Sequence, residues 1–417
     1  MKKTQKCINI ISYDFLYIHI REMMIKMKQH IINQIELYKE DFYRISKYIG
    51  ENPELGHEEV LACTVLTEEL KKHDFAVEVG TCGLATAFTA TFDSGKPGPV
   101  IGFMSEYDAL PEVGHACGHN LIGTMGIAAG IALSKVIQET GGKIIVFGTP
   151  AEETRGGKVT MADAGIFDAL DVAMMVHPSD NYVKSGASLA MDAIQFEFFG
   201  KPAHAAASPH AGINALDAVI QTFNSINALR QHIKPDARIH GIITEGGKAA
   251  NVVPDYAVAQ FYVRAAKRDY VNELVEKVKK CAEGAALQTG STMKWSFYEF
   301  SYDDMITNNE LSEAFNKELV SLGVNEEQIV VERDGSGSLD MGNVSQVVPS
   351  IHPYIKIVDV PTVAHTHEFR EAAMSEQGRE GMILGAKAMA LTAYEILTNP
   401  ELLAKIKEEF ASQKVFA

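Results

Sequence analysis

The sequence predicts an α/β protein, with a mixed, mostly parallel sheet, helices on both faces and a smaller α+β domain inserted into the chain. Two observations support this prediction. Before residue 187 and after residue 299, short continuous apolar runs alternate with helical stretches, as in sheets whose strands are buried on both faces. The segment between has strand–helix–strand–strand–helix–strand character, which indicates a compact domain of a different kind.

The elements of the two outer parts follow from the spacing of apolar residues. Apolar residues that recur every three to four positions predict helices at about 31–50, 58–73, 121–137 and 378–397. The helix at 121–137 is rich in glycine and alanine and is expected to be buried. Apolar runs of four to eight residues predict strands at Ala76–Val79, Ala85–Phe92, Val100–Ser105, Lys143–Gly148 and Val172–Val176. We expect residues 29–186 and 300–417 to form one discontinuous domain.

The inserted domain is expected to span residues 187–299. Its strands are predicted at Ala193–Phe199, Ala257–Val263 and Thr292–Tyr298, with a helix over Asn214–His232. Residues 1–28 are expected to be a disordered or spurious N-terminal extension. Asp14 and His19 interrupt its apolar run, no small-residue cleavage site follows, and the run is too short to span a bilayer.

The charge balance excludes two classes of partner. Lys plus Arg number 38 against 54 Asp plus Glu, a formal net charge of −16. So acidic a chain is not expected to bind nucleic acid or an anionic membrane, although a cleft with a few local cations can still take a small substrate. The 5 cysteines are scattered and form no CxxC pair, so we expect reduced thiols and a cytoplasmic protein.

Possible metal ligands gather just after the expected strands and in one distant loop. They are Cys117 and His119 after 100–105, Glu152 and Glu153 after 143–148, His177 after 172–176, and His365 and His367 far downstream. In open α/β sheets ligands bind at the carboxyl ends of the strands. The three strand ends are therefore predicted to converge on one crevice.

The residue types favour a metal-dependent hydrolase. Cys117 and His119 would diverge on a helix but lie on the same side of an extended loop. Of the neighbours Glu152 and Glu153, one can bind a metal while the other acts as a general base. A thiolate, imidazoles and carboxylates suit zinc, manganese or cobalt rather than calcium. A water made acidic by such an ion is the natural nucleophile.

Two alternatives stay open from the residues alone. Cys117 could be a nucleophile with a histidine as its base, giving a hydrolase that resists chelators and is inactivated by thiol alkylation. The flanking carboxylates would then have no obvious task. Alternatively, the chain could be a non-catalytic regulatory subunit of a hetero-oligomeric hydrolase. The intact Glu152 and the complete ligand set argue against that interpretation.

Five runs resemble the amidohydrolase branch of the zinc aminoacylase/carboxypeptidase metallopeptidase superfamily. They are HACGHN (115–120), PAEET (150–154), HP (177–178), GKPAHAAASPHAGINALDAV (200–219) and GSLDMGNVSQVVPSIHPY (337–354). The resemblance begins near residue 31, reaches the C-terminus and is nearest to p-aminobenzoyl-glutamate hydrolase subunits and related dipeptidases. It implies a zinc-peptidase-like catalytic domain that cleaves the amide bond of a small N-acyl amino acid, an aminobenzoyl-glutamate-like conjugate or a dipeptide.

The resemblance also implies the site residues. The ligands of two divalent metal ions, zinc or manganese with cobalt as an alternative, would be Cys117, His119, Glu153, His177 and His365. His365 is preferred to His367 because its distance from Phe369 matches the family pattern, although the residues alone do not separate the two histidines. Glu152 matches the general base that activates water and later protonates the leaving amine.

The inserted domain matches the satellite domain through which relatives dimerise. His204 matches a histidine that polarises the scissile carbonyl or stabilises the oxyanion, and that reaches the partner's site in dimeric relatives. A homodimer is therefore expected, with a second, different subunit as a further possibility. Asn251 and Arg264 are weaker candidates for substrate contact. The guanidinium of Arg264 suits a carboxylate, but a surface arginine is an equally good interpretation.

Overall fold

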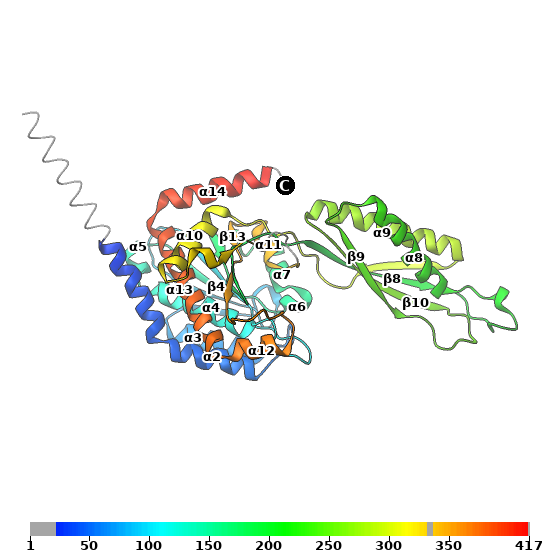
Figure 1. Ribbon diagram of the computed structural model, residues 1–417, viewed down its shortest axis with the longest axis horizontal. Coiled ribbons are helices and arrows are strands. Elements are labelled where there is room, and N and C mark those ends of the chain that lie inside the picture. Colours follow the sequence, from blue (N-terminus) through cyan, green and yellow to red (C-terminus); the bar gives the residue numbers. More distant parts are fainter. Residues whose placement is uncertain (1–21, 332–336, 416–417) are drawn as a thin grey trace, which may run out of the picture.

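The computed structural model describes residues 22–331 and 337–415 and shows two lobes, each with its own hydrophobic core (Figure 1). The core of the larger lobe takes residues from Ile31 to Val176 and again from Met305 to Ile406. The core of the smaller lobe takes residues from Ala190 to Ala286. The expected mixed α/β fold with an inserted α+β segment is confirmed.

The main sheet of the larger lobe has the strand order β1-β2-β4-β3-β5-β13. Its strands are β1 (Ala76–Val79), β2 (Phe88–Asp93), β3 (Val100–Ser105), β4 (Lys143–Gly148), β5 (Val172–Met174) and β13 (Ser350–Ile351). The pairs β4–β3, β3–β5 and β5–β13 are parallel, and β1–β2 and β2–β4 are antiparallel. A smaller sheet, β12-β7-β14-β6, joins β12 (Ile329–Val330), β7 (Tyr182–Val183), β14 (Tyr354–Lys356) and β6 (His177–Ser179).

The helices of the larger lobe pack around α4 (His119–Ser134), whose residues are all buried. This helix lies against β3 and β4, and helices α2 and α13 cover it. Such burial explains why its sequence is rich in glycine and alanine rather than amphipathic. The other helices are α2 (Lys39–Glu51), α3 (Val60–Lys72), α5 (Ile137–Thr140), α6 (Glu152–Arg155), α7 (Gly157–Asp163), α10 (Asn309–Ser321), α11 (Met341–Ser345), α12 (His367–Met374), α13 (Glu376–Thr398) and α14 (Pro400–Val415).

The N-terminal part differs from expectation where the structure describes it. Residues 22–37 are helical and continue through a turn at Tyr38 into α2. Lys28 lies inside the range assigned to an extension, yet its Nζ is 2.6 Å from Glu318 and 3.0 Å from Glu395. Residues 22–28 therefore belong to this helix, and residues 1–21 lie outside the described part of the chain. Among the described helices, none is both long and apolar enough to cross a bilayer.

The smaller lobe has the predicted element order: β8 (Ala190–Phe199), α8 (Ala215–Leu229), β9 (Arg238–Glu245), β10 (Tyr256–Ala265), α9 (Arg268–Thr289) and β11 (Thr292–Phe297). Its sheet is antiparallel with the order β11-β8-β10-β9, and α8 and α9 pack side by side on one face (Figure 1). Side chains alternate accordingly, with Phe196 and Phe198 buried and Glu197 half-buried. Asn214 caps α8 by accepting from the amides of Leu216 and Asp217.

Candidate active site

The predicted ligand residues come together at the ends of strands of the larger lobe. The chain leaves β3, crosses Glu106 and Asp108, and reaches Cys117 before α4 begins at His119. Gly118, between them, has a φ of 81°, a left-handed conformation that favours glycine. A Cβ on Gly118 would also lie 2.8 Å from Pro178 Cγ. This tight turn directs the thiol and the imidazole into one crevice.

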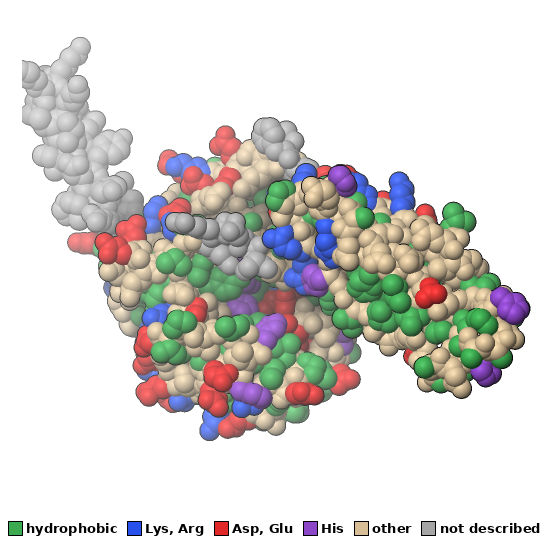
Figure 2. All heavy atoms as spheres, turned by 45° about the vertical axis from the view of Figure 1, so that its right-hand side comes forward, with side chains coloured by type: hydrophobic (Ala, Val, Ile, Leu, Met, Phe, Trp, Pro, Cys, Tyr) green, Lys and Arg blue, Asp and Glu red, His purple; other side chains and the backbone are tan. Residues whose placement is uncertain are grey.

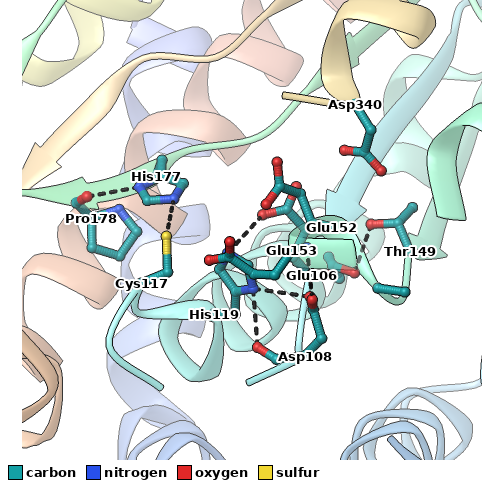
Figure 3. A network of polar contacts seen from close by, with 12 residues as sticks. Glu106, Asp108, Cys117, His119, Thr149, Glu152, Glu153, His177, Pro178 and Asp340 are labelled. Carbon is teal, nitrogen blue, oxygen red and sulfur yellow. Dashed lines mark hydrogen bonds and ion pairs between the residues drawn. The ribbon is translucent and has the colours of Figure 1, made fainter. Parts of the chain in front are cut away.

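Three further segments complete the cluster, and Figure 3 shows two of them, those of Glu152 with Glu153 and of His177. Strand β4 ends before Ala151, whose φ of 64° starts the short helix α6 that carries Glu152 and Glu153. His177 opens β6. The backbone N–H of His365 donates to the carbonyl of Ala116 at 2.9 Å, so a residue far along the chain is tied to the Cys117 loop.

The distances define one compact cluster. Cys117 Sγ is 3.4 Å from His177 Nε2. Glu153 Oε1 is 3.2 Å from His365 Nε2 and 3.9 Å from His119 Nε2. Ligand atoms lie within 4.8 Å of one another in three overlapping groups: Cys117 with His119 and His177, Cys117 with Glu153 and His365, and His119 with Glu152 and Glu153. His367 begins α12 and is in none of these groups among the described residues.

Asp108 fixes the orientation of His119. Both the carboxylate and the carbonyl oxygen of Asp108 lie 3.0 Å from Nδ1 of this histidine. The ring therefore presents Nε2 to the cluster, as metal-binding histidines usually do when a carboxylate holds the other nitrogen. Asp108 follows a predicted strand, but no sequence pattern indicates this role.

The donor set fits a divalent cation. His119 Nε2 is buried and has no hydrogen-bond partner among the described residues, and the buried Glu153 Oε1 has the ring of His365 beside it, at 3.2 Å. Burial and the neighbouring Glu153 raise the pKa of Glu152 and of the Cys117 thiol, because each added negative charge opposes the next. Although burial opposes it, the carboxylate of Asp108 raises the pKa of His119, whose proton a metal ion would replace. A cation bound here would pair with these buried donor atoms and stabilise the ionised forms of Glu152 and Cys117.

The cluster opens into a cavity of about 400 Å³ between the lobes, a size typical of small-molecule sites. Figure 2 shows histidine and acidic side chains gathered in the hollow where the lobes meet. All the cluster residues except His119 line this cavity. Arg264 lines it too, together with Tyr262 and Glu299 from the smaller lobe and His352 from the larger one. No sequence pattern had indicated a role for those last three.

Two predicted residues lie elsewhere. His204 and Asn251 are exposed neighbours in the smaller lobe, where the amide of Ala205 donates to the carbonyl of Asn251 at 3.0 Å. Neither lines the cavity of this chain. Nδ1 of His204 accepts from the amides of Ala206 and Ala207 at 3.3 and 3.2 Å, so Nε2 carries the proton. Such a ring can donate a hydrogen bond to an oxyanion.

Comparisons with known proteins agree with this geometry. Residues 191–290 match the peptidase dimerisation domain family. The chain is 37% identical to mouse Xaa-Arg dipeptidase over 400 residues, covering 92% of each chain. It is 29% identical to a p-aminobenzoyl-glutamate hydrolase subunit of Escherichia coli, covering 93% of this chain and 95% of that protein. A dinuclear metal-binding peptidase of the M20 family from Bacillus subtilis superposes with a TM-score of 0.66 at 19% identity, covering 87% and 99% of the two chains.

Proposed function

Because this chain belongs to the M20 family of metallopeptidases, we propose that its cavity hydrolyses the amide bond of a small N-acyl amino acid, an aminobenzoyl-glutamate-like conjugate or a dipeptide. The chain is an enzyme of the hydrolase class, as its curated relatives are. One observation carries the proposal: six side chains from four distant segments converge, and their ligand atoms form three overlapping groups in which the atoms lie within 4.8 Å of one another. The names of the relatives support dipeptides and aminobenzoyl-glutamate as starting substrates.

The metal ligands in this proposal are Cys117, His119, Glu153, His177 and His365. Together they would hold two divalent ions, with zinc and manganese favoured and cobalt possible, since thiolate, imidazole and carboxylate donors suit these metals. Burial and the nearby His119 lower the pKa of His177 to about 4, which keeps its ring neutral and ready to bind. Ions held there would supply Lewis acidity to the carbonyl and to the attacking water.

Glu152 is the proton carrier in this mechanism. It projects from the start of α6 beside Glu153, and it has no ion-pair partner among the described residues. A carboxylate in that position accepts the proton of the attacking water and then donates it to the nitrogen of the leaving amine. Tyr302 fixes the helix, because its hydroxyl donates to the carbonyl of Glu152 at 2.7 Å and accepts from the amide of Gly156 at 3.0 Å.

His204 would act from the partner chain of a homodimer. The side chain is exposed at a distance from the cavity of its own chain, while residues 191–290 match a dimerisation domain. We therefore assign residues 187–299 to a satellite domain that pairs two copies and brings His204, with Asn251 beside it, to the opposite cavity. There His204 Nε2 would donate to the developing oxyanion. Pairing with a second, different subunit is a further arrangement, since the Escherichia coli relative is itself named as one subunit of a hydrolase.

Arg264 is the proposed anchor for the substrate carboxylate. Its side chain is half-buried at the cavity wall and its Nε is buried without a hydrogen-bond partner among the described residues. A guanidinium with unused donors binds a carboxylate through two parallel hydrogen bonds. The alternative of a cysteine nucleophile fits less well, because burial raises the pKa of Cys117 and only a lowered pKa yields a reactive thiolate.

Co-expression of two variants tests both central roles at once. E152Q alone and H204A alone should each lose roughly 10²-fold or more in kcat while the metal content stays unchanged. When the two chains are co-expressed, random dimers would regain about a quarter of wild-type activity, because each mixed dimer has one complete site. Full activity of E152Q would refute its role as the base, and no recovery on mixing would refute action of His204 across the dimer.

A further inference from the structure

The outer wall of the cavity carries a second charged group next to Arg264. Tyr262 lies on β10 two residues before Arg264, and the guanidinium sits 5.3 Å from the centre of the Tyr262 ring. The hydroxyl of the same tyrosine donates to the carboxylate of Glu299, with O–O distances of 2.8 and 2.9 Å. Tyr262 therefore positions an arginine and a glutamate side by side at the cavity wall.

Arg264 and Glu299 do not form a direct ion pair with each other in the described part of the chain. Within the described residues, no ion pair of 4.0 Å or less joins Arg264 to Glu299, and the side chain that donates hydrogen bonds to the Glu299 carboxylate is Tyr262. A carboxylate has about four acceptor sites, so Glu299 can accept further hydrogen bonds from a ligand. Burial raises the pKa of Glu299, and Tyr262, Arg264 and Arg155 offset that effect only in part, so a further positive charge beside the carboxylate would be favourable.

The other carboxylates that line the cavity already have an ion-pair partner or a role in the proposed hydrolysis. Glu106 is paired with the buried Lys158 at 2.5 Å. Glu153 is a proposed metal ligand, and Glu152 beside it is the proposed proton carrier. Glu299 is thus the one acidic residue of the described cavity lining that has neither an ion-pair partner nor a role in the proposed hydrolysis, so it is available to bind a substrate.

We infer that Glu299, held by Tyr262, binds the positively charged side chain of the leaving amino acid and makes the enzyme select basic over neutral or acidic leaving groups. The inference rests on the proposed hydrolysis and on Arg264 as the carboxylate anchor. An amino acid whose carboxylate meets Arg264 has its side chain close by, where a guanidinium or ammonium group would meet Glu299. A glutamate side chain would instead be repelled, since like charges in a partly desolvated site cost affinity.

The test compares matched substrates that differ in side-chain charge. The metal-loaded full chain is assayed on three dipeptides that share an N-terminal residue and end in arginine, in its neutral isostere citrulline, or in glutamate. Wild type should prefer arginine to citrulline by roughly 10- to 100-fold in kcat/KM, the range expected for a hydrogen bond to a charged group. In E299Q this ratio should fall to about threefold or less, and in Y262F, which keeps the ring, to an intermediate value.

A binding measurement separates this inference from the proposed hydrolysis. Calorimetry with free arginine and citrulline should show the same preference in wild type and its loss in E299Q. The control is E283Q, which removes an exposed charge on α9 outside the cavity and should keep the wild-type ratio. If no dipeptide is cleaved but E299Q loses selective arginine binding, the hydrolysis proposal fails and this inference holds. Equal arginine-to-citrulline ratios in wild type and E299Q would overturn it.

Discussion

Lys158 is a single buried residue whose ion pairs connect segments that lie next to the site. Its side chain is fully buried, with Nζ 2.5 Å from Glu106 and 2.6 Å from Asp340, residues that come from the ends of two different segments of the larger lobe. Burial alone would lower the pKa of Lys158, but the charges of Asp340 and Glu106 raise it, so the ammonium stays charged. Because Glu106 also lies 3.6 Å from His119 Nε2, this network adjoins the proposed metal ligands.

Replacing Lys158 should therefore destabilise the larger lobe. K158M leaves two buried carboxylates without their partner and should lower the free energy of unfolding by about 3–5 kcal/mol. Circular dichroism in urea measures this change, with K317M, at an exposed lysine, as the control. The single tryptophan, Trp295, lies in the smaller lobe, so its fluorescence transition should move less. A circular dichroism midpoint equal to that of K317M would contradict the structural role.

Glu59 is a second buried acid that the sequence does not reveal. Its carboxylate accepts from the amide of Ala151 at 2.8 Å and from the hydroxyl of Thr86 at 2.7 Å, so it holds the turn that leads to Glu152. Burial raises the pKa of Glu59 from its ordinary value of 4.5 to about 7. The folded protein therefore binds more protons at this residue than the unfolded chain does between those two pH values.

The sign of the pH effect follows from that difference. Stability from Glu59 is fully present below pH 4.5 and is lost as the pH rises through 7, by up to about 3 kcal/mol. E59Q does not titrate, so between pH 5 and 8 its free energy of unfolding should fall less than that of wild type. Denaturation curves across this range measure the difference, and E58Q, at the exposed neighbour, should follow wild type. Parallel curves for E59Q and wild type would refute the shifted pKa.

At the scale of elements, the turn before α4 is the critical connection. Gly118 has a left-handed backbone, and any Cβ would collide with Pro178, the residue after His177. G118A should shift Cys117 and His119 relative to His177 and weaken metal binding by roughly 10-fold or more. Titration of metal into the stripped protein measures this loss. G284A, on helix α9, is the control because its Cβ would meet nothing within 4 Å. Equal affinities in both variants would argue against the role of the turn.

The elements predicted best from the sequence are those with a long apolar pattern and those whose residues are fully buried. The strands Val100–Ser105 and Lys143–Gly148 match residue for residue, because a continuous apolar run is bounded at each end by polar or turn-forming residues. The sheet β12-β7-β14-β6 was missed, since its strands of two or three residues are too short to show a pattern. The expected strand at Ala85–Phe92 begins only at Phe88, because the preceding residues form a turn.

The site could be predicted in part for a similar reason. Cys, His and paired Glu residues stand out after strands, and the structure brings Cys117, Glu153 and His365 together as expected. Lys158 and Asp340, separated by 182 positions, give no sequence signal of their contact, because a buried lysine is rare and its partner is set by the tertiary fold. Glu299 was missed likewise, since it joins the cavity only through the packing of the two lobes.

At the scale of the whole molecule, two lobes with separate cores share one cavity. The larger lobe contributes most of the proposed metal ligands and Glu152 to this cavity, and the smaller lobe contributes Arg264, Tyr262 and Glu299. Movement of one lobe relative to the other would therefore change the distance between the reacting bond and the groups that hold the substrate. His204 stands outside this arrangement within one chain, which is why the proposed mechanism requires a second copy.

The most direct test of metal-dependent amide hydrolysis is to strip the purified protein of metal and restore zinc, manganese or cobalt. Activity is measured at each stage on N-acyl amino acids, dipeptides and p-aminobenzoyl-glutamate. We predict that hydrolysis disappears with the metal and returns when one of these ions is restored, with two ions bound per chain. Hydrolysis that persists in the metal-free protein and is abolished by alkylation of Cys117 would contradict the account and favour a cysteine nucleophile.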